Sequence, residues 1–284
     1  MEVIAASRRG DLVRVARLQG DVLAEFWLWD LARPDDVGAV YTGRVEAVMT
    51  AMAGRFVDIG AAVGFLPDSA GGKGLSVGTY VSVQVSRAAQ GGKGPRLAVA
   101  QAECGDAPGL IRAGAGPLLE LCARVPGVEV LVDDYALMAQ LRPTLEGRMR
   151  YDARAFDAVL EDEVAGLAEA SADLPMGARM HVSAAAAAVM IDVDAGAGSE
   201  VSPMVLNLAI IPEICRQIVL RNLSGGILID FAGMKAAARA KLAEPLRAAL
   251  GRDFLRPEFL GFSHLGFAEI VRRRVRAPLH EVWR

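Results

Sequence analysis

Two apolar runs, each closed by an acidic residue, organise this sequence: AAVMIDVD at residues 187–194 and GGILIDF at residues 225–231. Unbroken apolar runs of this length are typical of strands that are buried on both faces of a sheet. Between them, after a Ser202-Pro203 start, apolar residues recur at helical spacing, and Pro212 is expected to kink the helix. The recurring positions are Leu206, Ile210, Ile214 and Ile218. The pattern therefore predicts a βαβ unit.

The acidic residues at the two strand ends, Asp192 and Asp230, are the first candidates for chemistry. Parallel neighbouring strands end at the same edge of a sheet, so the two side chains should meet there. Two carboxylates ~4 Å apart repel by about 4 kcal/mol at an effective dielectric constant of roughly 20, and they need a shared proton or a cation between them. Mg²⁺ is the simpler solution, and it activates water for phosphodiester cleavage. The alternative, that each Asp only caps the turn or helix that follows it, stays open from these residues alone.

In the rest of the chain, the sequence patterns predict strands first and strands alternating with helices later. Two alternating runs, residues 12–18 and 22–27, flank a glycine-containing turn and predict a β-hairpin. Short β-rich runs punctuated by glycine then predict a small antiparallel barrel at residues 38–101. From Pro108 onward, strand patterns alternate with helical ones, including an amphipathic helix at residues 154–170, which indicates α/β layering.

The composition of this 284-residue chain excludes several classes of protein. With 53% hydrophobic and 23% charged residues, the chain is globular rather than disordered. Its formal net charge of −3 gives no general attraction for nucleic acid, so any such contact is expected to be local. Cys104, Cys122 and Cys215 lack the spacing of a disulfide framework or a thiolate zinc site. We expect a cytoplasmic protein with no membrane span and no signal peptide.

Ordered motifs along the chain carry a resemblance to a known family. In and after the βαβ unit they are IDVD (191–194), NL (207–208), CRQ (215–217), GG (225–226), IDF (229–231) and SHLGFAEI (263–270). In the barrel region they are YTGRV (41–45), FVDIG (56–60), GFL (64–66) and GKGPRL (92–97). In this order and spacing the sequence resembles the ribonuclease E/G family over nearly its whole length, most weakly between residues 102 and 127.

The resemblance implies an α/β fold, an RNase H-like core with an inserted antiparallel OB-fold β-barrel. It assigns residues 1–37 to the first strands of that core, 38–101 to an OB-fold RNA-binding domain, 102–127 to an abbreviated 5′-sensor-like region and 128–284 to the α/β catalytic core with the metal site. It implies an endoribonuclease that hydrolyses single-stranded RNA with Mg²⁺, or with Mn²⁺ as a substitute. The products would carry 5′-phosphate and 3′-hydroxyl ends.

Individual roles follow from the same resemblance, position by position. Asp192 and Asp230 match the magnesium ligands, and Asp194 matches an Asn that orients them or the attacking water. The RNA-binding residues that it implies are Phe56, Phe65, Lys93 and Arg112. Aromatic faces stack bases at about 1–3 kcal/mol each, and Lys neutralises phosphate. Without the resemblance, barrel core is the simpler interpretation of the two phenylalanines.

Departures from the family pattern keep alternatives open. Asp194 adds a third carboxylate, AGAG at residues 195–198 replaces a Ser-, basic- and Thr-rich loop, and Ala113 replaces the Thr partner of Arg112, which predicts indifference to the RNA 5′ end. One alternative is an RNA-binding protein with little or no nuclease activity, and another is hydrolysis of a different phosphate substrate. The sequence stops at Arg284, before the family's paired-cysteine segment, so we expect no zinc, no zinc-linked tetramer, and a monomer or homodimer.

Overall fold

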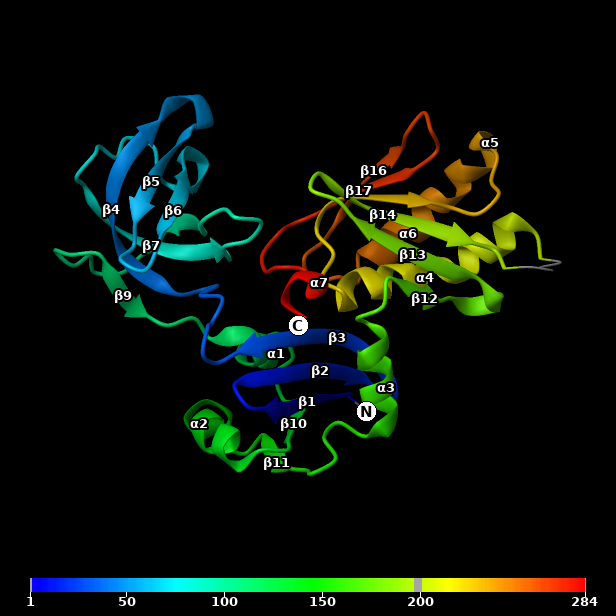
Figure 1. Ribbon diagram of the computed structural model, residues 1–284, viewed down its shortest axis with the longest axis horizontal. Helices are drawn as coiled ribbons and strands as arrows, with labels where there is room; N and C mark the ends of the chain where they lie inside the picture. Colours follow the sequence, from blue (N-terminus) through cyan, green and yellow to red (C-terminus); the bar gives the residue numbers. More distant parts are fainter. Residues whose placement is uncertain (1, 197–200, 284) are drawn as a thin grey trace.

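The computed structural model describes residues 2–196 and 201–283, which form three lobes, each built on its own sheet (Figure 1). The first lobe has a five-stranded sheet with the order β11-β10-β1-β2-β3. The hairpin prediction is confirmed, because β1 (Glu2–Arg9), β2 (Leu12–Gln19) and β3 (Val22–Asp30) pair antiparallel in sequence order. Two strands from far downstream, β10 (Glu129–Val132) and β11 (Met149–Tyr151), extend the sheet in parallel.

Helices cover both faces of this five-stranded sheet. The helices α1 (Gly116–Arg124) and α2 (Tyr135–Leu145) pack on one face, and α3 (Ala158–Gly166) packs on the other. The side chain of Asp157 caps α3 by accepting a hydrogen bond from the N–H of Leu160 at 2.9 Å. The predicted helix at residues 154–170 was too long at both ends, since this cap fixes its start and the helix ends at Gly166.

The second lobe is a closed barrel, as the glycine-punctuated runs predict. Its ring runs β4-β5-β6-β8-β7 and returns to β4, and β9 pairs with the outer side of β4. The strands are β4 (Val40–Met49), β5 (Gly54–Asp58), β6 (Val63–Pro67), β7 (Tyr80–Arg87), β8 (Arg96–Val99) and β9 (Gly109–Arg112), with short 3₁₀ turns η1 (Thr50–Met52) and η2 (Asp68–Ala70). Gly43 is required where β4 crosses β5, because a Cβ there would collide with Val57. The closed five-strand ring is consistent with an OB-like fold.

The third lobe is a six-stranded sheet with the order β12-β13-β14-β15-β17-β16. Its strands are β12 (Ser171–Asp173), β13 (Arg179–Ala184), β14 (Ala188–Asp194), β15 (Gly225–Asp230), β16 (Glu258–Phe262) and β17 (Ala268–Arg272). The predicted βαβ unit is confirmed, because β14 and β15 pair in parallel and α4 (Pro203–Leu220) connects them. All the other pairs in this sheet are antiparallel. The mixed sheets and helices make the chain an α/β protein.

One face of the six-stranded sheet is open, and the prediction of strands buried on both faces was wrong. Along β14, the side chains of Val189, Ile191 and Val193 are buried beneath the helices. On the opposite face of the strand, Met190 is 42% exposed, and Asp192 and Asp194 are also exposed. The helices α4 and α6 (Ala243–Leu250) cover only the face that carries Val189, Ile191 and Val193. Antiparallel neighbours flank the parallel pair, and sheets with such neighbours commonly leave one face to solvent.

The remaining helical segments are short. They are α5 (Ala236–Arg239), α7 (Leu279–Val282), η3 (Pro175–Gly177) and η4 (Ala240–Leu242). In the described part of the chain, α4 alone is long and apolar enough to cross a membrane by length and composition. Half of it is buried, and its predicted apolar face packs on the six-stranded sheet, as the core helix of a folded domain does.

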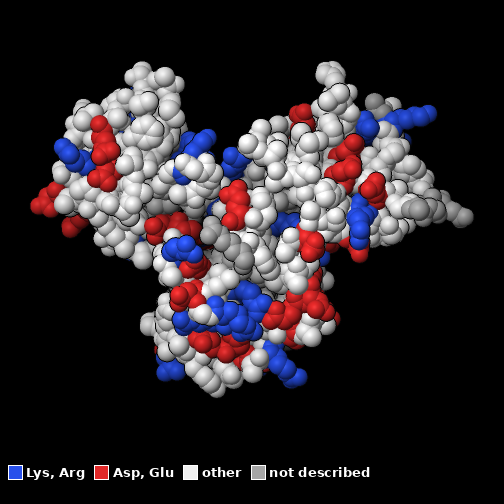
Figure 2. Space-filling model, in the orientation of Figure 1, with Lys and Arg blue, Asp and Glu red and all other residues white. Residues whose placement is uncertain are grey.

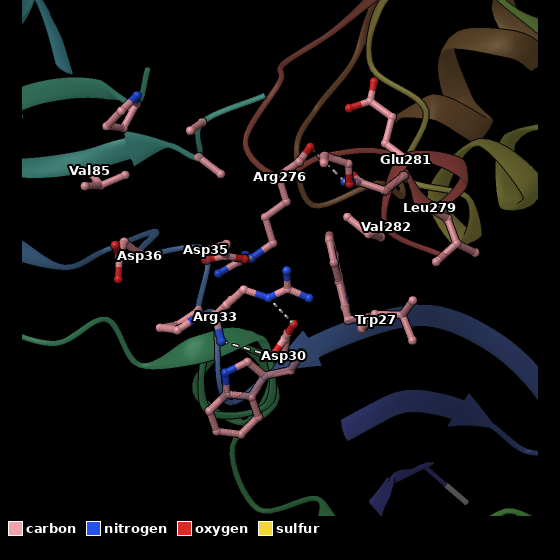
Figure 3. A pocket seen from close by; sticks show the side chains of 18 of the residues that line it. Trp27, Asp30, Arg33, Asp35, Asp36, Val85, Arg276, Leu279, Glu281 and Val282 are labelled. Carbon is pink, nitrogen blue, oxygen red and sulfur yellow. Dashed lines mark hydrogen bonds and ion pairs between the residues drawn. The ribbon is translucent and has the colours of Figure 1, made fainter. Parts of the chain in front are cut away.

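The three lobes meet where the C-terminal segment crosses between them. The space-filling view shows a notch between the barrel and the six-stranded lobe, with basic side chains on both of its walls (Figure 2). At this junction Arg276 donates to Asp35 at 2.5 Å, and its guanidinium lies 5.7 Å from the centroid of the Trp27 ring (Figure 3). Arg276 also donates to Glu120 at 2.8 Å. These contacts line a cavity of about 470 Å³ that all three lobes share.

Candidate functional site

Asp192 and Asp230 lie opposite each other at the carboxyl ends of two parallel strands. They are direct Cα partners in the register of β14 and β15, as the βαβ pattern predicts. Ile191 and Ile229, the residues before them, are buried toward the helices, so both carboxylates project from the open face. Neighbouring strands lie about 4.8 Å apart, which is close enough for two carboxylates to hold one cation.

Both carboxylates are available for a ligand. Asp192 is exposed and Asp230 is half-buried, and within residues 2–196 and 201–283 neither side chain makes a hydrogen bond or an ion pair. Over the same residues, no three His, Cys, Asp or Glu side chains gather closely enough to share a metal ion. The site therefore offers two carboxylates rather than a cage of protein ligands.

Asp194 projects from the same open face, two residues beyond Asp192. In the sheet register its partner is Arg179 on β13, and the guanidinium of Arg179 pairs with Asp173 at 3.0 Å. Residues two apart on a strand are about 7 Å apart, so Asp194 lies beside the carboxylate pair rather than within it. The loop that follows it extends into residues 197 and 198, which lie outside the described residues.

His181 is a neighbour of the carboxylate pair that the sequence patterns do not single out. It is exposed on β13 and is the register partner of Asp192. Its Nδ1 lies 3.1 Å from the hydroxyl of Ser171 on β12. The signal for it would have been the pairing of β13 with β14, which fixes which side chains share the open face but is not a local sequence pattern.

Asn207 of α4 fixes the backbone just beyond Asp230. Its side-chain amide is fully buried and donates to the carbonyl oxygens of Pro203 at 2.7 Å and Ala232 at 2.8 Å. Phe231, between Asp230 and Ala232, is buried in the same core. The sequence marks Asn207 only as part of a motif, whereas in the structure this side chain anchors the loop that follows Asp230.

The predicted RNA-binding residues lie on the barrel lobe, away from the carboxylates (Figure 1). Phe56 and Phe65 are register partners on β5 and β6, with ring centroids 5.7 Å apart in an edge-to-face arrangement. Both rings are partly exposed and lie outside the buried barrel core of Val57, Leu66 and Leu97. Barrel core, the simpler interpretation from residues alone, therefore does not describe them.

Lys93 and Arg112 are exposed at two other places on the barrel. Lys93 closes the turn that begins at Gln90, just before β8, and the N–H of Phe65 donates to the carbonyl of Pro95 in the same segment. Arg112 ends β9, the strand paired with β4. The structure thus brings the two phenylalanines together, places Lys93 in the segment that pairs with Phe65, and leaves Arg112 on a separate strand.

Comparison with known proteins covers the segment that holds the carboxylates. The model of the ribonuclease E/G family matches residues 130–275, just over half of the chain. Ribonuclease E of Synechocystis sp. is 32% identical over 117 residues, which are 39% of this chain and 17% of that protein. Ribonuclease G of Salmonella typhimurium is 30% identical over 129 residues, 43% of this chain and 26% of the relative. A ribonuclease E/G-like protein of Pyropia yezoensis is 30% identical over 116 residues, which are 39% of this chain and 23% of that protein.

These matches span about a quarter or less of the relatives' own length. The family match begins in β10 and ends just after β17, so it includes both strands that carry Asp192 and Asp230 and the helix between them. On this match the chain belongs to the ribonuclease E/G family.

Proposed function

We propose that this protein is a magnesium-dependent endoribonuclease that cleaves single-stranded RNA. The observation that carries the proposal is the register of β14 and β15, which sets Asp192 opposite Asp230 on an open sheet face. That pair lies inside the segment matched by the ribonuclease E/G family model. The relatives are named ribonucleases, which supports RNA as the substrate class.

The residues at this site fit a hard divalent cation. Mg²⁺ binds proteins through one or two carboxylates and keeps several waters, and Mn²⁺ accepts the same ligands. Asp192 and Asp230 supply those carboxylates, and the open face leaves room for water and for a phosphodiester. When bound, Mg²⁺ supplies Lewis-acid chemistry and neutralises charge at the scissile phosphate.

The chain's own residues position the reaction. Asp192 and Asp230 would hold the cation at the strand ends, and Asn207 keeps the backbone after Asp230 in place. Asp194, on the same face, orients the attacking water by accepting its hydrogen bond. The water oxygen bonds to phosphorus, the bond from phosphorus to the 3′ oxygen breaks, and the 3′ oxygen takes a proton. The products carry a 5′-phosphate and a 3′-hydroxyl.

The barrel holds the RNA strand. Phe56 and Phe65 present partly exposed rings that stack bases without a sequence requirement. Lys93 and Arg112 neutralise backbone phosphates. Because Ala113 stands beside Arg112 in place of a hydroxyl-bearing residue, we propose that cleavage is indifferent to the phosphorylation state of the 5′ end.

The five-stranded sheet is our candidate for the RNase H-like core, with the OB-like barrel inserted after β3. The carboxylate pair lies on the separate six-stranded sheet, so the proposed catalytic segment, residues 128–284, contributes strands to both sheets. We propose that the protein acts on RNA in the cytoplasm as a monomer or homodimer, without zinc.

Incubation of end-labelled single-stranded RNA with the protein, with Mg²⁺ or with EDTA, tests this function. The Asp192→Asn, Asp230→Asn double variant should lose cutting, because both cation ligands lose their charge. The matched control is Glu258→Gln on β16, at the far edge of the same sheet, where an exposed carboxylate makes no ion pair with any described residue; this variant should cut as the wild type does. Cutting that survives the double variant or EDTA would overturn the proposal.

One observation favours a second function, an RNA-binding protein with little or no nuclease activity. Asp194 lies on the same open face as the carboxylate pair, and it adds negative charge where the phosphodiester must approach. The same experiment separates the two functions. RNA retarded on a native gel, but left intact by both wild type and double variant, identifies the binding protein.

A further inference from the structure

Three arginines from three elements gather where the barrel meets the six-stranded lobe. Arg87 ends β7 and Arg96 begins β8, and the two are register partners. Arg274 lies in the segment after β17, and its guanidinium fills the space that a Cβ of Gly225 would occupy at the start of β15. The N–H of Ala88 donates to the carbonyl of Val275 at 2.8 Å, which holds the two lobes together at this point.

The three guanidinium groups have no acidic partner among the residues that the structure describes. None of them makes an ion pair or a side-chain hydrogen bond there, and the Nε of Arg87 is buried without an acceptor. Burial, and then the charges of Arg96 and Arg274, lower the pKa of Arg87. Like charges held together without an acceptor are costly, and a bound anion would relieve that cost.

The other arginines near the C-terminus have structural partners or are exposed outside this cluster. Arg272 is buried and donates to Asp253 at 2.6 Å, and Arg276 pairs with Asp35 and Glu120. Arg273 is exposed, and the charges that lower the pKa of Arg87 are those of Arg96 and Arg274. The basic run that the sequence shows thus separates into structural residues and one residue, Arg274, that joins the two arginines of the barrel.

We propose that Arg87, Arg96 and Arg274 form a binding site for a backbone phosphate of single-stranded RNA, placed between the barrel and the carboxylate pair. Guanidinium forks match the oxygens of a phosphate, and each donates two parallel hydrogen bonds. The proposal rests on the proposed function, because the phosphate belongs to the RNA that the site would cleave.

The position of this arginine cluster supports that ligand. On one side, Arg96 is the register partner of Phe65, so the cluster borders the aromatic pair. On the other side, Gly225 opens the strand that Asp230 closes, and the two ends are roughly 17 Å apart at about 3.3 Å per residue. A strand held by the barrel would pass the arginines and then cross the open sheet face to reach the carboxylates.

Fluorescence anisotropy with labelled single-stranded RNA tests the site, at several salt concentrations and in EDTA so that no cutting occurs. The Arg96→Gln, Arg274→Gln double variant removes two exposed guanidinium groups and should bind RNA about tenfold more weakly than the wild type. The magnitude of its slope of log K against log salt concentration should be smaller by about 0.7 to 1. Arg273→Gln loses the neighbouring charge only, and should bind within about twofold of the wild type. Equal binding by the double variant and Arg273→Gln would overturn the site.

A second readout needs no RNA and separates this site from the proposed function. At low salt, Arg96→Gln and Arg274→Gln should each raise the thermal midpoint by relieving repulsion, and inorganic phosphate should stabilise the wild type more than the double variant. If phosphate stabilises wild type, double variant and Arg273→Gln alike, the cluster is not a phosphate site. Loss of cutting with Asp192→Asn, Asp230→Asn tests the nuclease alone, so either proposal can fail while the other stands.

Discussion

Asp194 stands where the resemblance to the family implies an Asn, and changing it to Asn is informative. The carboxylate lies about 7 Å along the strand from Asp192, on the face that a phosphodiester must approach. Asp194→Asn keeps the shape and an oxygen that can accept the hydrogen bond of the attacking water, and it removes this repulsion. We therefore expect kcat/KM for RNA to rise by about three- to tenfold, roughly 1 kcal/mol, in initial-rate assays at saturating Mg²⁺. Glu258→Gln, on β16 at the far edge of the sheet, serves as the charge-matched control. A fall in kcat/KM as deep as that of Asp192→Asn would instead make Asp194 a ligand.

The three cysteines differ in reactivity for physical reasons that the sequence does not reveal. Cys104 is exposed, whereas burial raises the pKa of Cys122 and raises that of Cys215 to about 12. Because the thiolate is the reactive form, an aromatic disulfide reagent at mildly alkaline pH should modify one thiol per native chain and all three in denaturant. Cys104→Ser should abolish the native reaction, and rapid modification of a second thiol in the native protein would contradict the burial.

At the scale of elements, Asn207 connects α4 to the strand that carries Asp230. Asn207→Ala removes two buried hydrogen bonds, and we expect it to lower the free energy of unfolding by about 1–3 kcal/mol and to raise the Mg²⁺ concentration for half-maximal cutting several-fold. Ser202→Ala is the control, since it removes the cap of the same helix at a cost of about 1 kcal/mol without touching Ala232. Equal metal dependence in both variants would limit Asn207 to stability.

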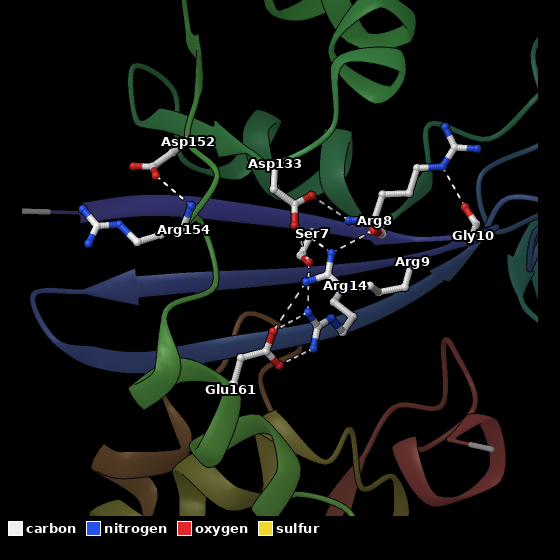
Figure 4. Close-up of polar contacts among 9 residues, drawn as sticks. All are labelled: Ser7, Arg8, Arg9, Gly10, Arg14, Asp133, Asp152, Arg154 and Glu161. Atoms are coloured by element: carbon white, nitrogen blue, oxygen red, sulfur yellow. Dashed lines mark hydrogen bonds and ion pairs between the residues drawn. The ribbon is translucent and has the colours of Figure 1, made fainter.

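A second element-scale contact, between α3 and β2, depends on pH (Figure 4). Arg14 donates to Glu161 at 2.5 and 2.7 Å, and this hydrogen bond is the main reason that the pKa of Glu161 lies below its ordinary value of 4.5. Arg9 lowers the pKa further, whereas burial and Asp133 oppose the shift. A lowered carboxyl pKa stabilises the fold above the unfolded value and loses that effect as pH falls through the folded value.

Glu161→Gln should therefore be less stable than the wild type in urea titrations at pH 7, by under about 1 kcal/mol because the carboxylate is partly exposed. The difference should shrink as pH falls below the ordinary glutamate range. The exposed Glu244, on α6, supplies the control Glu244→Gln, which should show little difference at either pH. A difference that grows on acidification would contradict the sign.

Sequence patterns predicted the elements that local residues determine and missed what depends on pairing. The apolar face of α4 and the parallel strands ending in Asp192 and Asp230 follow from periodicity and strand-end chemistry, and the structure has both. The open face was missed because Met190 and Leu228 continue the apolar runs, although neither belongs to the core that the described helices cover. His181 was missed because its place beside Asp192 depends on register.

At the scale of the whole molecule, segments that are distant in the sequence come together in the lobes. Local sequence patterns therefore predict neither the lobes nor the contacts between them. The strands β10 and β11 complete a sheet begun at the N-terminus, and the C-terminal segment returns to the barrel at Ala88. The arginine cluster exists only because of that return. Its members lie on β7, on β8 and after β17, and sequence spacing gives no indication that they meet.

Arg276 holds this arrangement together, and its removal should loosen the lobes without unfolding them. Its buried guanidinium binds Asp35, just before the barrel, and Glu120 of α1. Arg276→Met keeps the apolar stem over Trp27 but leaves two carboxylates unpaired. We expect the free energy of unfolding to fall by about 1–3 kcal/mol. This loss is smaller than for a fully buried pair, because both acids are about one-third exposed. Limited proteolysis should then cut the segment between β3 and β4 faster, and small-angle scattering should show a larger radius of gyration. Arg273→Met changes an exposed neighbour and should alter neither the rate of proteolysis nor the radius of gyration. An unchanged rate of proteolysis in Arg276→Met would mean that the backbone contact at Ala88 suffices to fix the barrel.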